Sequence, residues 1–164
     1  MRKTIILFAI FTTLFIGNAS AQFRGTFGMG AHTAVGFDRH NLGGGFHIHY
    51  YWTDNLRMAP SATFFLPQNN IRTWKAEFDM HVVAPLTFST VAYPIVGMSY
   101  TNRRFTPPAA EDANRWTRHR IGGNFGVGVQ HDIIYRVRVN FELKYHLIRN
   151  YSQVGFMMGI GFFI

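Results

Sequence analysis

The chain has 164 residues, no cysteine, and 16 Lys and Arg against 8 Asp and Glu, which gives a formal net charge of +8. The length fits one domain, and the lack of cysteine excludes disulfide bonds and thiolate-bound metal. A basic excess of this kind fits nucleic acid, phosphorylated lipid heads or sugars, and the compartment decides among them.

The amino terminus has the pattern of a secretory signal peptide. Arg2 and Lys3 precede an apolar run of thirteen residues, Ile5 to Gly17, and Ala19-Ser20-Ala21 offers a small-residue cleavage site. Such a run covers about 20 Å as a helix, short of the roughly 30 Å needed to cross a membrane. We predict a cleaved signal peptide at residues 1–21, one domain at residues 22–164, and an exported protein with no nucleic-acid partner.

Beyond the signal peptide, apolar and polar residues alternate in steps of two. Alternation indicates β-strands, because successive side chains of a strand point to opposite faces. The first three predicted strands are residues 22–37, 46–52 and 56–66. A turn at residues 38–43 and a tight reversal at residues 53–55 join them.

The fourth predicted strand, residues 74–82, has the clearest pattern. Lys75, Glu77, Asp79 and His81 share one face, and every residue on the opposite face is apolar. No helical period puts those charged residues on one face, so this segment is a strand.

The second half of the chain repeats the alternation. The fifth predicted strand, about residues 90–100, is the least regular because Pro94 interrupts it, and a long loop is predicted at residues 101–118. The last three predicted strands are residues 120–130, 136–147 and 153–164.

The closing strand has two faces, neither of them hydrophilic: one is large and apolar, the other mostly glycine. A sheet with one face in water would show polar residues there, so the large face is expected to contact lipid. Strands of about ten residues, tilted by about 40°, span roughly 25 Å, the height of the apolar band of a membrane barrel. We predict an all-β, eight-stranded antiparallel up-and-down transmembrane β-barrel. Its short turns, at residues 53–55, 84–85 and 131–134, would face the periplasm, and the loops at residues 38–43, 67–72, 101–118 and 148–152 would face outward.

The cost of a charge in lipid determines which face points inward. All the Asp, Glu, Lys and Arg residues of the predicted strands lie on the polar faces. A charge facing lipid costs about 2 to 4 kcal/mol at the midplane, so exposing half of them would cost as much as the whole stability of a domain. An eight-stranded barrel is only wide enough to be filled by side chains, so a plugged polar lumen is expected. Its predicted network is Lys75, Glu77, Asp79, His81, Arg138, Glu142 and Lys144.

These features resemble the small eight-stranded outer-membrane barrels of Gram-negative bacteria, the OmpX-like and OmpA-transmembrane-like type. The resemblance covers residues 22–164 and rests on the signal peptide, the strand alternation and the closing V-G-F-M-M-G-I-G-F-F-I. It implies a location in the outer membrane, insertion by the barrel-assembly machinery, and a non-enzymatic envelope structural or surface-interaction role. The family commonly ends in an aromatic residue, whereas this chain ends in Ile164. The family's long protruding outer strands are expected to be absent here.

Two other functions remain possible from the sequence: a narrow porin-like channel, and an enzyme that modifies lipid A or phospholipid. The enzyme would need a Ser-His-acid set, for which Ser61, Ser99, His81 and His146 are the candidates, but no pairing is visible. We therefore predict no catalytic residues and no cofactor.

A metal site was also considered. His47 and His49 share a strand face and would need His81 or Asp79 as a further ligand. Polar lumen residues bonded to their neighbours are the more frequent outcome of such a pattern, so no metal is predicted.

Basic residues outnumber acidic ones in the predicted outer loops. Arg103, Arg104, Arg115 and Arg118 are the predicted contacts to lipopolysaccharide phosphates, because guanidinium groups suit phosphate geometry. Pro60 and Pro94 cannot donate ladder hydrogen bonds, and bulges are predicted at both.

Overall fold

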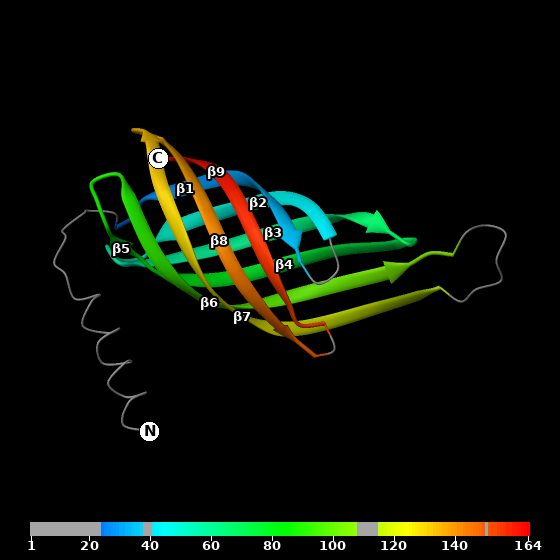
Figure 1. Cartoon of the computed structure of the whole chain (residues 1–164). Coiled ribbons are helices and arrows are strands. Elements are labelled where there is room, and N and C mark those ends of the chain that lie inside the picture. Colours follow the sequence, from blue (N-terminus) through cyan, green and yellow to red (C-terminus); the bar gives the residue numbers. More distant parts are fainter. Residues whose placement is uncertain (1–23, 38–40, 108–114, 150) are drawn as a thin grey trace, which may run out of the picture.

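The computed structural model describes residues 24–37, 41–107, 115–149 and 151–164, and in these ranges the chain forms a β-barrel (Figure 1). The predicted signal peptide, residues 1–21, lies outside the described residues. No helix in the described ranges is long and apolar enough to cross a membrane. The strands are β1 Phe27–Gly36, β2 Asn41–Tyr51, β3 Leu56–Gln68, β4 Ile71–Val82, β5 Ala84–Pro85, β6 Thr90–Phe105, β7 Trp116–Ile134, β8 Val137–Ile148 and β9 Gln153–Phe163.

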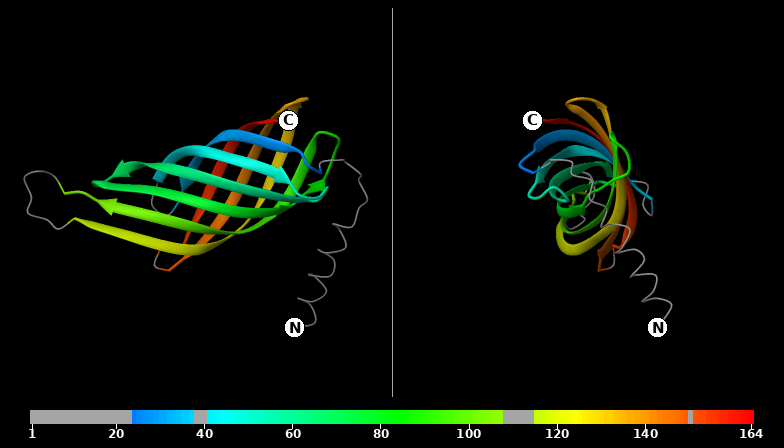
Figure 2. Two further views of the ribbon diagram at one scale, coloured as in Figure 1. Left: turned by 180° about the vertical axis from the view of Figure 1, so that it is seen from behind. Right: turned by 90° about the vertical axis from the view of Figure 1, so that its left-hand side faces the viewer.

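The eight long strands pair antiparallel with their neighbours in sequence, and two further pairings close the wall. β1 pairs with β9. β4 pairs directly with β6, and the two-residue strand β5, which lies between them in the sequence, also pairs with β6. The view from behind in Figure 2 shows the tilted strands passing round this closed wall. The predicted eight-stranded antiparallel barrel is therefore confirmed.

One end of the barrel, which we call the short-turn end, carries three reversals and both ends of the strand set. The reversals are residues 52–55, 86–89 and 135–136, and the backbones of Phe27 and Ile164 hydrogen-bond there. The predicted reversal at residues 131–134 is wrong: β7 continues to Ile134 with a register shift between Asp132 and Ile134. The register shift accommodates the consecutive Ile133 and Ile134, which interrupt the alternation of apolar and polar residues in the sequence.

The opposite end, the long-hairpin end, is uneven. β3 and β4 run on to a two-residue turn, Asn69 and Asn70, whose φ angles of 49° and 60° are typical of the hairpin turn that matches strand twist. β6 and β7 remain paired as far as Phe105 and Trp116. Figure 1 shows these four strands projecting past the other four. The predicted loops at residues 67–72 and 101–118 are therefore too long, since residues 67–68, 71–72, 101–105 and 116–118 belong to strands, and residues 108–114 lie outside the described residues. The predicted absence of protruding strands is wrong.

Neither proline produces the predicted bulge. Pro60 pairs with Phe78 and Pro94 with Val127, and in both pairings the register is unbroken on either side. A proline removes one donor from the ladder but does not by itself add a residue to the strand. The two register shifts lie elsewhere, between Phe65 and Gln68 and between Asp132 and Ile134.

Side chains alternate between an apolar exterior and a mixed interior. Exposed outward residues include Phe46, Phe78, Phe125, Leu143 and Ile160. The interior is mostly polar, except near the short-turn end, where an apolar cluster lies inside the wall. Its members are Tyr51, Val83, Val91, Tyr93, Ile95 and Phe163.

Candidate functional site

Lys144 lies at the centre of the buried charges inside the barrel. Its Nζ is 2.9 Å from Asp79 Oδ2, 3.4 Å from Glu142 Oε2 and 3.5 Å from Glu77 Oε1. Lys75 Nζ is 3.1 Å from the other oxygen of Glu77. β4 and β8 are separated in the wall by β6 and β7, so the pairs of Lys144 with Asp79 and Glu77 cross the lumen.

Asn124 on β7 joins the carboxylates to a histidine. Its Nδ2 donates to Glu77 Oε1 at 3.0 Å and to Asp79 Oδ1 at 2.8 Å, while its Oδ1 is 3.0 Å from His146 Nδ1. The alternation had put Asn124 on the inward face, but an uncharged side chain gave no reason to select it. Its burial, with 0% of its surface exposed, makes these hydrogen bonds necessary.

Arg57 on β3 forms a second centre, nearer the apolar cluster. It donates to His81 Nδ1 from Nε at 3.1 Å, to Tyr51 Oη at 3.2 Å and to Gln130 Oε1. Its guanidinium lies 4.3 Å from the centre of the Tyr93 ring. Tyr93 in turn donates to Glu142 Oε1 at 3.0 Å, which connects Arg57 to the Lys144 centre.

The seven predicted network residues are all buried. Six of them belong to the Lys144 and Arg57 centres described above. Arg138 is linked to the Arg57 centre through Asp132 Oδ1, which lies 2.9 Å from Arg138 Nε and accepts from Gln130 Nε2 at 3.4 Å, and the guanidinium of Arg138 lies 4.0 Å from the Phe163 ring. The prediction did not include the other members of this network, which are Tyr51, Arg57, Tyr93, Asn124, Gln130, Asp132 and His146.

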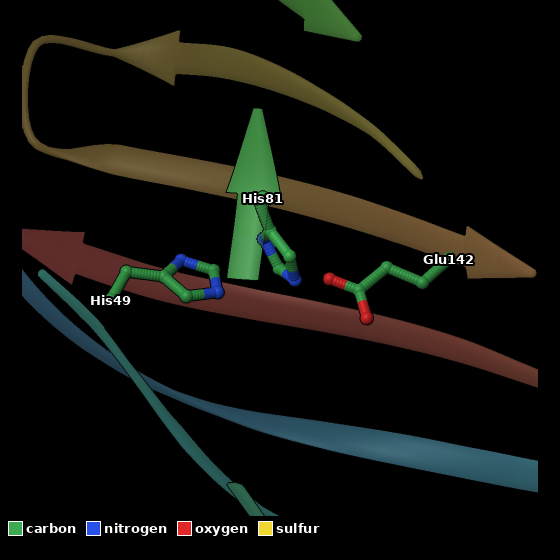
Figure 3. Close-up of side chains that lie close together, drawn as sticks. All are labelled: His49, His81 and Glu142. Carbon is green, nitrogen blue, oxygen red and sulfur yellow. The ribbon is translucent and has the colours of Figure 1, made fainter. Parts of the chain in front are cut away.

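The structure gathers one possible set of metal ligands, from His49, His81 and Glu142, whose ligand atoms lie within 4.8 Å of one another (Figure 3). Among the described residues, His47 is not part of this set. An arginine can only donate, so His81 Nδ1 accepts from Arg57 and the proton of the neutral ring lies on Nε2. A metal would have to displace that proton beside a fixed guanidinium cation, so these residues fit a divalent ion poorly.

The serines considered for catalysis are not paired with histidine in the described part of the chain. Ser61 Oγ and Ser99 Oγ are buried without a hydrogen-bond partner. His81 bonds to Arg57, and His146 bonds to Asn124 and lies 3.2 Å from Lys75 Nζ.

Three of the four arginines predicted to contact phosphate are divided between the two faces of the projecting strands. Arg103 alternates with the buried Thr101 and pairs in register with Arg118. Arg104 lies on the other face, in register with Arg72 of β4. The guanidinium of Arg103 lies 4.8 Å from the Tyr151 ring, and that of Arg118 lies 4.9 Å from the Trp116 ring. Arg115 is exposed just before β7.

No protein-family model and no curated protein matches the chain. Solved structures do. The N-terminal β-barrel domain of Pseudomonas aeruginosa OprF matches with a TM-score of 0.73 at 14% identity, over 86% of this chain and 98% of that one. Ail of Yersinia pestis matches with a TM-score of 0.63 at 14% identity, over 86% and 99%. Neisserial surface protein A matches with a TM-score of 0.64 at 12% identity, over 84% and 95%. The chain therefore has the fold of the small eight-stranded outer-membrane β-barrels.

Proposed function

We propose that the protein is a non-enzymatic integral barrel of the outer membrane, with a plugged lumen and a structural or surface-interaction role in the envelope. The short-turn end would face the periplasm and the long-hairpin end the outside, as in barrels of this fold. The apolar exterior supports this proposal, because it matches a lipid environment while Lys75, Glu77, Asp79, Glu142 and Lys144 are enclosed.

The single observation that carries the plugged lumen is the set of ion pairs that cross it. Lys144 and its three carboxylates are buried, and the cavity beside them, lined by Lys75, Glu77 and His146, measures about 10 Å³. That volume is about the minimum for a single water molecule. The apolar cluster around Tyr93 would close the periplasmic side.

Conductance across a planar lipid bilayer tests this proposal against the narrow channel. The purified folded protein is expected to give no discrete steps in the current. An open porin, purified and inserted in the same way, serves as the positive control. Steps of a size that requires a continuous water column would exclude the plug.

Two further measurements address location and the enzyme alternative. Membrane fractionation is expected to recover the protein with the outer membrane, with a mature amino terminus at Gln22. Mass spectrometry of lipid A and phospholipid, with and without the gene, is expected to show identical species. A new acylation or deacylation product that depends on the gene would favour the enzyme instead.

We also propose two partners for this location. The barrel-assembly machinery would insert the chain, and the outer arginines would contact lipopolysaccharide. Arg104 supports the second partner best, because it is exposed on the outward face of the projecting strands.

A further inference from the structure

The outward face of β4, β6 and β7 is layered along the barrel axis. Phe78 and Met98, which are register partners, are exposed in the apolar band. Next along the strands towards the long-hairpin end come Trp74 and Tyr100, with ring centres 5.4 Å apart. Tyr100 Oη and Asn102 Nδ2 both lie within hydrogen-bond distance of His119 Nδ1. An aromatic and polar layer directly beyond an apolar band is typical of the membrane interface.

Two arginines follow immediately beyond this layer. Arg72 and Arg104 are cross-strand partners and both are exposed; Arg72 precedes the buried Thr73 and Arg104 follows the half-buried Arg103 of the inner face. Directly opposed side chains on a sheet are about 5 Å apart at Cβ, and like charges so placed repel. An anion bound between the two guanidinium groups would remove this repulsion and stabilise the folded barrel.

The projecting strands themselves supply no such anion. No Asp or Glu occurs in residues 66–76, 98–107 or 115–121, which are the described residues of this region. None of the described residues of this region therefore supplies the counter-charge, and at this height beside the apolar band the nearest other molecules are membrane lipids.

We propose that Arg72 and Arg104 together bind a phosphate on the headgroup of an outer-leaflet lipid, whose acyl chains lie over Phe78 and Met98. This inference rests on the proposed outer-membrane location and sharpens the lipopolysaccharide contact to one pair of residues. Two guanidinium forks on adjacent strands hold a phosphate by charge-assisted hydrogen bonds. Arg103 and Arg118 form the equivalent register pair on the inner face and do not take part.

The two pairs provide matched variants with equal loss of charge. The protein would be folded in alkyl glucoside micelles, which carry no phosphate, in a Trp52→Phe, Trp116→Phe background where Trp74 alone reports. Titration with diphosphoryl lipid A is expected to show binding weakened about tenfold or more in R72Q/R104Q, because the charge-assisted hydrogen bonds to the phosphate are lost. Binding in R103Q/R118Q is expected to stay within about twofold of the parent.

Three outcomes would overturn the proposal. The first is an equal loss in both double variants, and the second is equal binding of dephosphorylated lipid A by the parent. The third is competition by inorganic phosphate as strong as by the lipid, which would assign the pair to a free ion. Fractionation of the same variants separates this inference from the proposed function: a parent protein found outside the outer membrane removes both, whereas correct location with any of the three outcomes removes only the arginine pair.

Discussion

Replacing Lys144 by methionine should destabilise the barrel more than any other loss of one charge inside it. Lys144 Nζ contacts Asp79, Glu142 and Glu77 at 2.9 to 3.5 Å, and the side chain is buried. Methionine keeps most of the volume but leaves three buried carboxylates with Lys75 as the remaining cation of their centre. Breaking a buried ion pair by removing one partner costs about 3 to 5 kcal/mol, so we expect a loss of about 5 kcal/mol in K144M. A loss of this size is comparable to the total stability of many domains.

Urea unfolding in phospholipid vesicles, followed by tryptophan fluorescence, measures this loss. K75M is the matched control, because Lys75 is equally buried but contacts a single carboxylate, Glu77, at 3.1 Å. Its loss should be about 3 kcal/mol, at the lower end of the range for a broken buried pair. Adding Asp79→Asn to K144M should recover part of the lost free energy. A loss below about 1 kcal/mol in K144M, the level of exposed ion pairs, would mean that water reaches these groups and would refute the reasoning.

Three other predictions concern the wall, a turn and the amino terminus. Gly45→Ala should destabilise the barrel by about 1 to 3 kcal/mol in the same unfolding assay, because the new Cβ would overlap the carbonyl of Ala62. Gly44→Ala, whose nearest neighbour would be 3.6 Å away, should change stability little; equal effects would contradict the close approach of Gly45 to Ala62. Asn70→Val should lower the free energy of unfolding by about 1 to 2 kcal/mol, because Asn70 has a positive φ of 60°. Asn70→Gly should be neutral or stabilising, and a valine that leaves the stability unchanged would count against the tight turn. Ala19→Leu together with Ala21→Leu should block signal-peptide cleavage, seen as a heavier mature protein by mass spectrometry; normal processing would remove the predicted cleavage site.

The sequence was sufficient for the strands inside the apolar band. In residues 74–82, charged and apolar residues alternate without exception, and β4 has that face pattern. The signal depends on the contrast between lipid and lumen, and it disappears where both faces of a strand meet water. Thr101 to Phe105 and Trp116 to Arg118 therefore resembled a loop, although backbone pairing extends through them.

A second limit concerns β6 near the short-turn end. Val91, Tyr93 and Ile95 point inward there, so that both faces of the strand are apolar and the period is hidden. The polar residues Ser99 and Thr101 lie on the same inward face. Counting back from them in steps of two along β6 would have identified Val91, Tyr93 and Ile95 as inward residues.

The members of the polar network could be selected by face but not by partner. Arg57 was assigned inward, but its position beside His81 depends on the register of β3 against β4. Its contact with Gln130 depends on which strands lie opposite each other across the lumen. Closure of the wall and the stagger of its strands determine both, and neither is encoded in local alternation.

The unequal strand lengths give the molecule an obliquely cut rim. The paired strands β3, β4, β6 and β7 project together at the long-hairpin end. The other strands end lower, and connections of only four residues join β1 to β2 and β8 to β9. A large protein that approaches this end from one side would contact the projecting strands first. From the other side it would contact the short β1–β2 and β8–β9 connections at the end of the barrel. Approach to the long-hairpin end of this barrel thus depends on direction, and shortening β3, β4, β6 and β7 to the length of the other strands would remove that dependence without changing the barrel wall below.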